Sequence, residues 1–209
     1  MLRNPNGLAT AVTVLLGVDV LLFLIGAGSE AWIVADPLAA VDSYATVEAF
    51  DLLMAVGYLV YLATAVVFII WFHRVASNAS VWAADLQGRK PGWAIGGWFV
   101  PIGNLWIPRQ IAVDVWRASR QDPYAADGAR ELTLLNSWWA CFVLGLILDR
   151  LSTGLYRQAE TLDALSTAAT WSLAGYAFVV AAGVLALLFV RRLTSMQHTK
   201  ATGMLSAAK

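Results

Sequence analysis

Four stretches of the chain are apolar over enough length to cross a bilayer, and polar loops separate them. They cover about residues 8–27, 50–72, 132–148 and 169–190. A membrane-spanning helix needs about 20 mostly apolar residues. The third stretch is shorter than the others, and Asp149 and Arg150 follow it directly. This pattern predicts an all-α integral membrane protein with four transmembrane helices.

A fifth apolar stretch, residues 93–108, is broken by Pro101 and Pro108 and also contains Asn104 and several glycines. Each proline removes a backbone donor and pushes the preceding residue toward extended geometry. Lipid does not tolerate exposed irregular backbone, so such a segment must be covered by protein or line a cavity. We expect a re-entrant or interfacial element that enters and returns on one face, with glycines permitting the turn and close helix approach. A fifth crossing is the alternative.

The distribution of basic residues favours the re-entrant arrangement. Lysine and arginine collect on the cytoplasmic side of membrane proteins. With four crossings, every lysine and arginine except Arg150 and Arg157 lies inside. We therefore expect a multi-pass protein of the cell membrane with both termini cytoplasmic.

Polar segments on the cytoplasmic side complete the expected organisation. Residues 109–121 have apolar and polar side chains on opposite faces at helical spacing, which predicts an amphipathic helix along the membrane surface. Residues 75–93 are expected to form a loop. Residues 1–192 form one membrane-embedded domain in this interpretation, and residues 193–209 form a mobile cytoplasmic tail.

Two segments, Trp71–Ala79 (WFHRVASNA) and Gly92–Ser119, resemble the actinobacterial membrane proteins grouped as domain of unknown function 4328. The shared core consists of Pro101, Asn104, Leu105, Pro108 and Gln110. The resemblance extends from the second predicted span to the last. It implies a bacterial cell membrane and the same broken central segment, and it implies no activity.

Composition changes this picture in only a few respects. Hydrophobic residues make up 59% of the 209 residues and charged residues 13%, whereas soluble domains have about 25% charged residues. The net charge of +0 gives no reason to expect a nucleic-acid partner. Cys141 is the single cysteine, which excludes an intrachain disulfide. His73 and His198 lack metal-ligand spacing, and we expect neither a metal nor a cofactor.

Asp19, near the middle of the first predicted span, is the first candidate for chemistry. A carboxylate at that depth costs about 2.5–3.5 kcal/mol on insertion scales. It can serve as a proton donor, an ion ligand or a ligand anchor. The alternative is a structural hydrogen bond to a neighbouring helix, for example to Asn136. Asp114, on the predicted amphipathic helix, is the other candidate catalytic residue, although it can equally pair with Arg117 or orient Arg109.

The remaining candidates gather around the broken segment. The ligand-binding candidates are Trp98, Pro101, Asn104, Trp106, Pro108, Arg109, Gln110, Arg117, Asn136, Trp138 and Trp139. Tryptophans can line an apolar cavity or simply pack in a core. The arginines, with Arg120, can bind phosphate head groups or merely set topology. The amide of Asn104 can cap the broken helix or contact a ligand.

Three functions fit these features. The first is a non-catalytic protein that holds an apolar or lipid-like molecule in a tryptophan-lined cavity, as a sensor, carrier or accessory subunit. The second is a membrane enzyme acting on a lipid or isoprenoid, such as a terpene cyclase that uses Asp19 as its acid. The third is a scaffold for cytoplasmic partners. Membrane lipids, an apolar small molecule and further copies of the chain are the expected partners.

Overall fold

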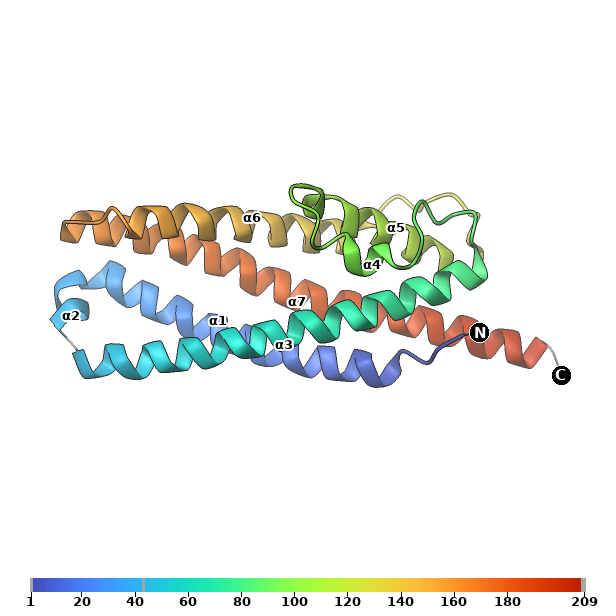
Figure 1. Cartoon of the computed structure of the whole chain (residues 1–209), viewed down its shortest axis with the longest axis horizontal. Coiled ribbons are helices and arrows are strands. Elements are labelled where there is room, and N and C mark those ends of the chain that lie inside the picture. The colour runs from blue at the N-terminus through green and yellow to red at the C-terminus, as the bar shows by residue number, and fades with distance from the viewer. Residues whose placement is uncertain (1, 43, 208–209) are drawn as a thin grey trace. The chain divides into compact units, whose positions relative to one another are not determined.

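The computed structural model describes residues 2–42 and 44–207, and these contain helices and no strand. The elements are α1 (Asn6–Ala35), α2 (Pro37–Asp42), α3 (Tyr44–Trp82), α4 (Trp93–Gly96), the 3-10 turn η1 (Gly103–Leu105), α5 (Ile107–Ala118), α6 (Thr133–Tyr156) and α7 (Leu162–Ala207) (Figure 1).

Four of these helices are long and apolar enough to cross a membrane. The qualifying segments are Asn6–Ala35, Phe50–Trp82, Thr133–Tyr156 and Leu162–Met204. The predicted all-α class with four apolar helices is therefore confirmed. Each helix extends beyond the stretch expected from hydropathy, because a helix continues wherever packing supports it, whereas hydropathy marks only its apolar portion.

The chain divides into two units, and each long helix contributes part of its length to both. The first unit comprises residues 1–14, 63–136 and 185–209, and the second comprises residues 15–62 and 137–184. The first unit contains the broken segment and the amphipathic helix. The second contains Asp19 and Glu30.

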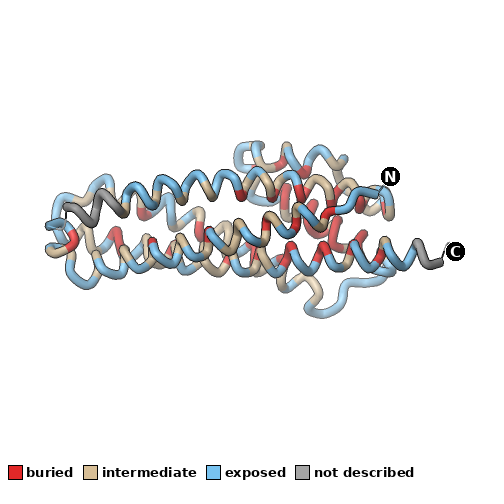
Figure 2. Tube along the Cα trace, turned by 90° about the horizontal axis from the view of Figure 1, so that it is seen from below, coloured by how far each residue is buried: buried red, intermediate tan, exposed pale blue. Residues whose placement is uncertain are grey.

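The first unit has a dense aromatic and aliphatic core with buried residues from α3, α5 and α7, and Figure 2 shows buried stretches gathered in one part of the tube. Trp71 of α3 and Phe189 of α7 are fully buried, with their ring centroids 6.0 Å apart. Trp116 of α5 stacks with Phe189 at 6.1 Å and is 5% exposed. Close packing of this kind transmits constraints between helices and leaves little free volume.

Polar side chains cross the same core and join the three helices. Gln197 of α7 donates to the carbonyl of Val75 and to Ser119 Oγ, both at 3.0 Å. Asn78 Nδ2 donates to Gln197 Oε1 at 3.0 Å and to the carbonyl of Arg3 at 2.8 Å. Buried amides need such partners, because an unpaired one costs free energy comparable to a lost hydrogen bond.

Two element boundaries expected from the sequence are wrong, because the helices joined by this network are longer than predicted. Residues 75–82 belong to helix α3 and not to a loop, and α7 continues to Ala207 and does not give way to a tail near residue 193. Leu193 is fully buried and Lys200 is 6% exposed. Lys200 Nζ donates to the carbonyls of Ala118 and Arg120 and so satisfies the C-terminal end of α5. Residues 208 and 209 of the expected tail lie outside the described residues.

The second unit exposes many aliphatic side chains, such as Leu21, Leu52 and Leu59, each more than 60% exposed. Hydrocarbon can cover these surfaces. Its interior contains a hydrogen-bonded group from three helices: Glu30 of α1 accepts hydrogen bonds from the Tyr156 hydroxyl of α6 and from Ser172 Oγ of α7, the latter at 2.8 Å. Polar contacts of this kind fasten helices to one another inside a membrane.

Candidate functional site: the broken segment and its supports

The broken segment consists of two short helical pieces joined by an unusual turn. The chain leaves α4 through turns at Gly97–Val100, and η1 then leads into α5. Ile102 lies between these pieces with φ 60° and ψ −44°, and it is the only described residue other than glycine with positive φ. The Gly103 N–H donates to the Pro101 carbonyl at 2.6 Å, which closes a γ-turn around Ile102. This form of γ-turn is rare and strained, above all for a β-branched residue.

Two glycines allow the segment to fold tightly against the start of α5. A Cβ on Gly97 would lie 2.6 Å from Ile107 Cγ2, and one on Gly103 would lie 2.9 Å from Ile107 Cδ1. Contacts this short are not tolerated, so both positions require a residue without a side chain. The expected role of glycine in close approach therefore applies at these two positions.

The two flanks of the broken segment lie side by side. Arg89, before the segment, donates from Nη1 to Gln110 Oε1 of α5 at 2.7 Å. The Gly88 N–H donates to Asp114 Oδ2 at 3.1 Å. The backbone before the broken segment and the helix after it are therefore joined by hydrogen bonds.

Trp98 defines how far along α3 the segment reaches. Its ring lies edge-on to Phe68 and Phe72, with centroid distances of 5.9 and 6.3 Å. Phe68 precedes His73 and Arg74, the polar positions that follow the apolar part of α3, by more than one helical turn. The broken segment therefore lies alongside the apolar portion of α3.

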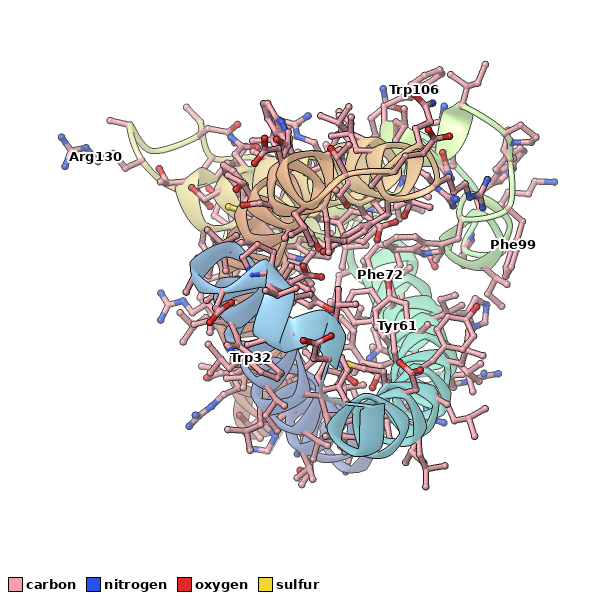
Figure 3. The ribbon with its side chains drawn as sticks, turned by 90° about the vertical axis from the view of Figure 1, so that its left-hand side faces the viewer. Trp32, Tyr61, Phe72, Phe99, Trp106 and Arg130 are labelled. Carbon is pink, nitrogen blue, oxygen red and sulfur yellow. The ribbon has the colours of Figure 1, made fainter. Side chains whose placement is uncertain are left out.

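Trp98 itself is a packing residue, but its neighbours on the segment point outward. Phe99 is 73% exposed, Ile102 71%, Trp106 47% and Leu105 40%. Figure 3 shows Phe99 and Trp106 at the outer edge of the ribbon, whereas Phe72 lies inside. Four large apolar side chains within eight residues are therefore exposed, and we call this stretch the apolar edge (Phe99, Ile102, Leu105 and Trp106). Patches of this kind mark a surface that contacts lipid, ligand or protein.

Asn104 and Pro108 have backbone roles in this segment. The Asn104 N–H donates to the Val100 carbonyl at 2.9 Å, and its side-chain amide forms no hydrogen bond with any described residue. Among the described residues, the Asn104 amide therefore does not cap a helix end as expected. Pro108 is buried in the first turn of α5, where a missing N–H costs nothing.

The apolar face of α5 contacts protein. Ile111, Ala112 and Val115 are buried, as are Val113 and Trp116. Helix α5 spans Ile107–Ala118, against the expected range of 109–121, because Lys200 and the Ser119 hydroxyl terminate it.

The four arginines around the broken segment fall into two classes, and two of them are neutralised. Arg117 forms an ion pair with Asp127 at 2.6 Å, and Arg120 pairs with Glu131 at 2.6 Å and also with Asp127. Hydrogen bonds from Arg117 and Arg120 lower the pKa of Asp127 to about 2. These pairs fasten the 121–131 loop onto α5, so the structure commits Arg117, a sequence candidate for ligand binding, to that loop.

The other two arginines are held by neutral amides. Arg109 Nη2 donates to Asn136 Oδ1 of α6 at 2.7 Å, and Arg89 donates to Gln110 as described above. Among the ion pairs of residues 2–42 and 44–207, none involves Arg109 or Arg89. Asn136 was named as one possible partner for Asp19, and its amide oxygen accepts a hydrogen bond from Arg109.

Asp114 is partly buried beside these arginines. Burial raises the pKa of its carboxyl group above the usual value, and the Gly88 N–H, Arg117 and Arg89 oppose that rise. The hydrogen bond to Gly88 fixes the loop before the broken segment.

The remaining sequence candidates belong to the second unit. Asp19 is 3% exposed. Trp138 and Trp139 of α6 are also buried and pack edge to face at 5.6 Å, and Trp139 further contacts Phe142 at 5.4 Å. Of the aromatic candidates in the first unit, Trp98 packs on α3 and Trp106 is exposed.

Sequence reasoning missed Glu30, Tyr156, Asn78, Gln197 and Lys200. The available signal was a polar residue within or next to a long apolar helix, which must find an internal partner. Within the described ranges, no three His, Cys, Asp or Glu side chains come together in a way that would hold a metal ion.

Comparison with known proteins identifies one family. A family model described as "Domain of unknown function (DUF4328)" matches residues 33–195. No curated protein and no solved structure matches the chain.

Proposed function

The chain belongs to the DUF4328 family, whose description assigns no activity, and we propose that it is a non-catalytic membrane protein that holds a lipid or similar apolar molecule against its broken segment. It would act as a sensor, a carrier or an accessory subunit in a bacterial cell membrane, with both termini cytoplasmic. The observation that carries this proposal is the exposure of Phe99 and Ile102, at 73% and 71%, on a segment whose two flanks are hydrogen-bonded together.

The proposal places the broken segment as a re-entrant hairpin in the inner leaflet. Its flanks meet at Arg89 and Gln110, which supports entry and return on one face. Trp98 lies beside Phe68, which supports immersion next to the apolar part of α3. In that position the apolar edge faces acyl chains, and the irregular backbone is covered on its other side by α3 and α5.

Binding is favoured over catalysis because of what the candidate acids contact. The Asp114 carboxylate accepts the Gly88 N–H, a structural role that needs no substrate. The Asp19 residue is 3% exposed, whereas the residues of the apolar edge are 40–73% exposed. An isoprenoid enzyme of terpene-cyclase type remains the alternative function, with Asp19 as its acid, and a scaffold for cytoplasmic partners is the third.

The test is native mass spectrometry of the detergent-purified full chain, combined with lipid extraction of the same sample. We expect a co-purified lipid or isoprenoid in the wild type and its loss in the Phe99→Ser/Ile102→Ser double variant. Val81→Ser is the matched control, since Val81 is 54% exposed on α3 outside the broken segment. Equal retention in all three proteins, or no bound molecule in the wild type, would contradict the proposal.

Asp19→Asn separates the enzyme from the binding protein. A binding protein keeps its ligand in this variant, because the apolar edge is unchanged. An isoprenoid enzyme instead accumulates unconverted substrate. The same spectra also report whether the chain forms homo-oligomers.

A further inference from the structure

We infer that the lipid at the broken segment carries an anionic phosphate head group, recognised chiefly by Arg109 and secondarily by Arg89. The inference rests on the proposed function, because it names the head group of the molecule that the apolar edge would hold.

The first argument is charge. Asp127 and Glu131 neutralise Arg117 and Arg120, which leaves Arg109 and Arg89 as the arginines beside the segment without a carboxylate ion pair in the described ranges. Asp114 lies within electrostatic range of Arg89, but its Oδ2 accepts the Gly88 N–H. Arg109 thus keeps the least compensated charge of the four.

The second argument is orientation. A guanidinium has five N–H donors in a planar fork. Arg109 gives one nitrogen, Nη2, to Asn136 Oδ1 at 2.7 Å. A neutral amide fixes the side chain without cancelling its charge, so the remaining donors are available for a second acceptor. A phosphate presents several oxygens in the geometry that this fork matches.

The third argument is the apolar neighbourhood. Trp106 is the N-cap residue of α5, and Arg109 lies three residues later in the first turn of this helix. The Trp106 ring is 47% exposed, and Ile102 on the adjoining turn is 71% exposed. A basic group next to exposed aromatic and aliphatic side chains fits a molecule with an anionic head and acyl chains. A zwitterionic lipid would place its own cation near the guanidinium.

The experiment measures head-group preference. Full-length protein in detergent is mixed with equal amounts of phosphatidylglycerol and phosphatidylcholine of identical acyl chains, and native mass spectrometry gives the ratio bound. We expect the wild type to prefer phosphatidylglycerol by about tenfold, because phosphatidylcholine carries a cation beside the same phosphate and so has no net negative charge. Arg109→Gln should abolish most of this preference, and Arg89→Gln should reduce it less.

The matched control is Arg117→Gln, which removes a positive charge from the same helix at a position already paired with Asp127. We expect it to leave the preference unchanged. Arg109→Lys keeps the charge without the fork and should retain part of the preference. An unchanged ratio in Arg109→Gln, or equal losses in Arg109→Gln and Arg117→Gln, would overturn the inference.

The two proposals fail in different ways. If the wild type retains both lipids equally, and the apolar-edge variant releases both, the head-group inference fails and the proposed function survives. If the wild type retains neither lipid and carries no co-purified apolar molecule, the proposed function fails and the inference fails with it. The thermal unfolding midpoint of each variant confirms that it is folded.

Discussion

Gln197 of α7 donates a hydrogen bond to the hydroxyl of Ser119 at 3.0 Å, and both side chains are 1% exposed. Ser119 closes the C-terminal end of α5, and its own hydroxyl donates to the Val115 carbonyl at 2.7 Å. The end of the helix that follows the broken segment is therefore fixed by a residue far along the chain. Because Trp106 directly precedes α5 and Arg109 lies in its first turn, this polar junction helps to position the candidate site.

Gln197→Leu is expected to lower the free energy of unfolding by about 1–3 kcal/mol, the cost of leaving buried polar partners unsatisfied. The variant removes the acceptor of Asn78 Nδ2 and the donor to Ser119 at once. Detergent-based reversible unfolding measures the change. Gln158→Leu is the control, since Gln158 is exposed and makes only a backbone hydrogen bond. If both variants lose the same free energy of unfolding, the buried hydrogen bonds of Gln197 add no stability beyond the general effect of replacing a glutamine with a leucine.

Ile102→Gly is expected to raise the thermal unfolding midpoint while weakening lipid retention. Residues held in such sparsely populated backbone regions cost about 1–3 kcal/mol, and glycine adopts positive φ without that penalty. The exposed isoleucine side chain, however, is part of the apolar edge.

Ile95→Gly is the matched control, because Ile95 is 40% exposed on α4 and has ordinary helical geometry. Glycine inside a helix costs about 0.5–1 kcal/mol, so this variant should lose stability. A lower midpoint in Ile102→Gly as well would mean that the γ-turn is not strained in solution.

Much of the fold was predictable from local pattern. Apolar stretches long enough to span a bilayer identify four helices, because the hydrophobic requirement is a property of each segment alone. Pro101 and Pro108 identify the break in the same way, through the backbone donors that they remove. The family resemblance through the Pro101 to Gln110 core is confirmed by the family match.

The partners of individual side chains were not predictable, because they depend on which helices meet. Arg109 and Arg117 have the same charge on the same helix, yet one meets the Asn136 amide and the other the Asp127 carboxylate. The continuation of α7 past Leu193 depends likewise on contacts with Ser119 and Ala118, which lie about 80 residues earlier in the sequence. Periodicity contains no information about such pairs.

Tyr156→Phe is expected to destabilise the second unit. The variant removes the hydroxyl that donates to Glu30 and leaves the ring in place. Hydrogen bonds between membrane helices contribute about 0.6 kcal/mol on average and at most about 1.7 kcal/mol. Unfolding in mixed detergent micelles measures the loss, and Tyr58→Phe is the control because Tyr58 is 62% exposed. If Tyr156→Phe is as stable as Tyr58→Phe, the group around Glu30 does not hold the helices together.

Asp114→Asn is expected to flatten the pH dependence of stability above pH 4. Burial raises the pKa of the Asp114 carboxyl group in the folded protein above its value of 3.8 in the unfolded chain. The folded state therefore binds more protons, and stability falls as the pH rises from 3.8 through the folded-state pKa. An asparagine amide oxygen still accepts the Gly88 N–H, so the variant keeps the loop without this penalty. A steeper decline in the variant would contradict the assignment.

Asp127→Asn should remove a pH dependence of the opposite sign, in which stability rises with pH, and it should do so at lower pH. Hydrogen bonds from Arg117 and Arg120 lower the pKa of Asp127 to about 2 from the ordinary 3.8. Between these two values the unfolded chain binds more protons than the folded protein, so stability rises with pH in this window. The contribution of Asp127 is fully present above about pH 4 and is lost as the pH falls toward 2. The variant lacks this carboxylate, and its unfolding midpoint should change less between pH 4 and 2 than that of the wild type.

Salt supplies an independent check on Asp127. Exposed ion pairs are screened at high ionic strength, and in 1 M salt the Debye length is about 3 Å. Salt should therefore reduce the difference in unfolding midpoint between the wild type and Asp127→Asn. Asp163→Asn is the control, since Asp163 is exposed and forms no ion pair with a described residue. If wild type and Asp127→Asn lose stability in parallel from pH 4 to 2, the two arginines do not hold the 121–131 loop through this carboxylate. Arg117 and Arg120 would then be free to bind an anion, and the contrast with Arg109 that underlies the head-group inference would disappear.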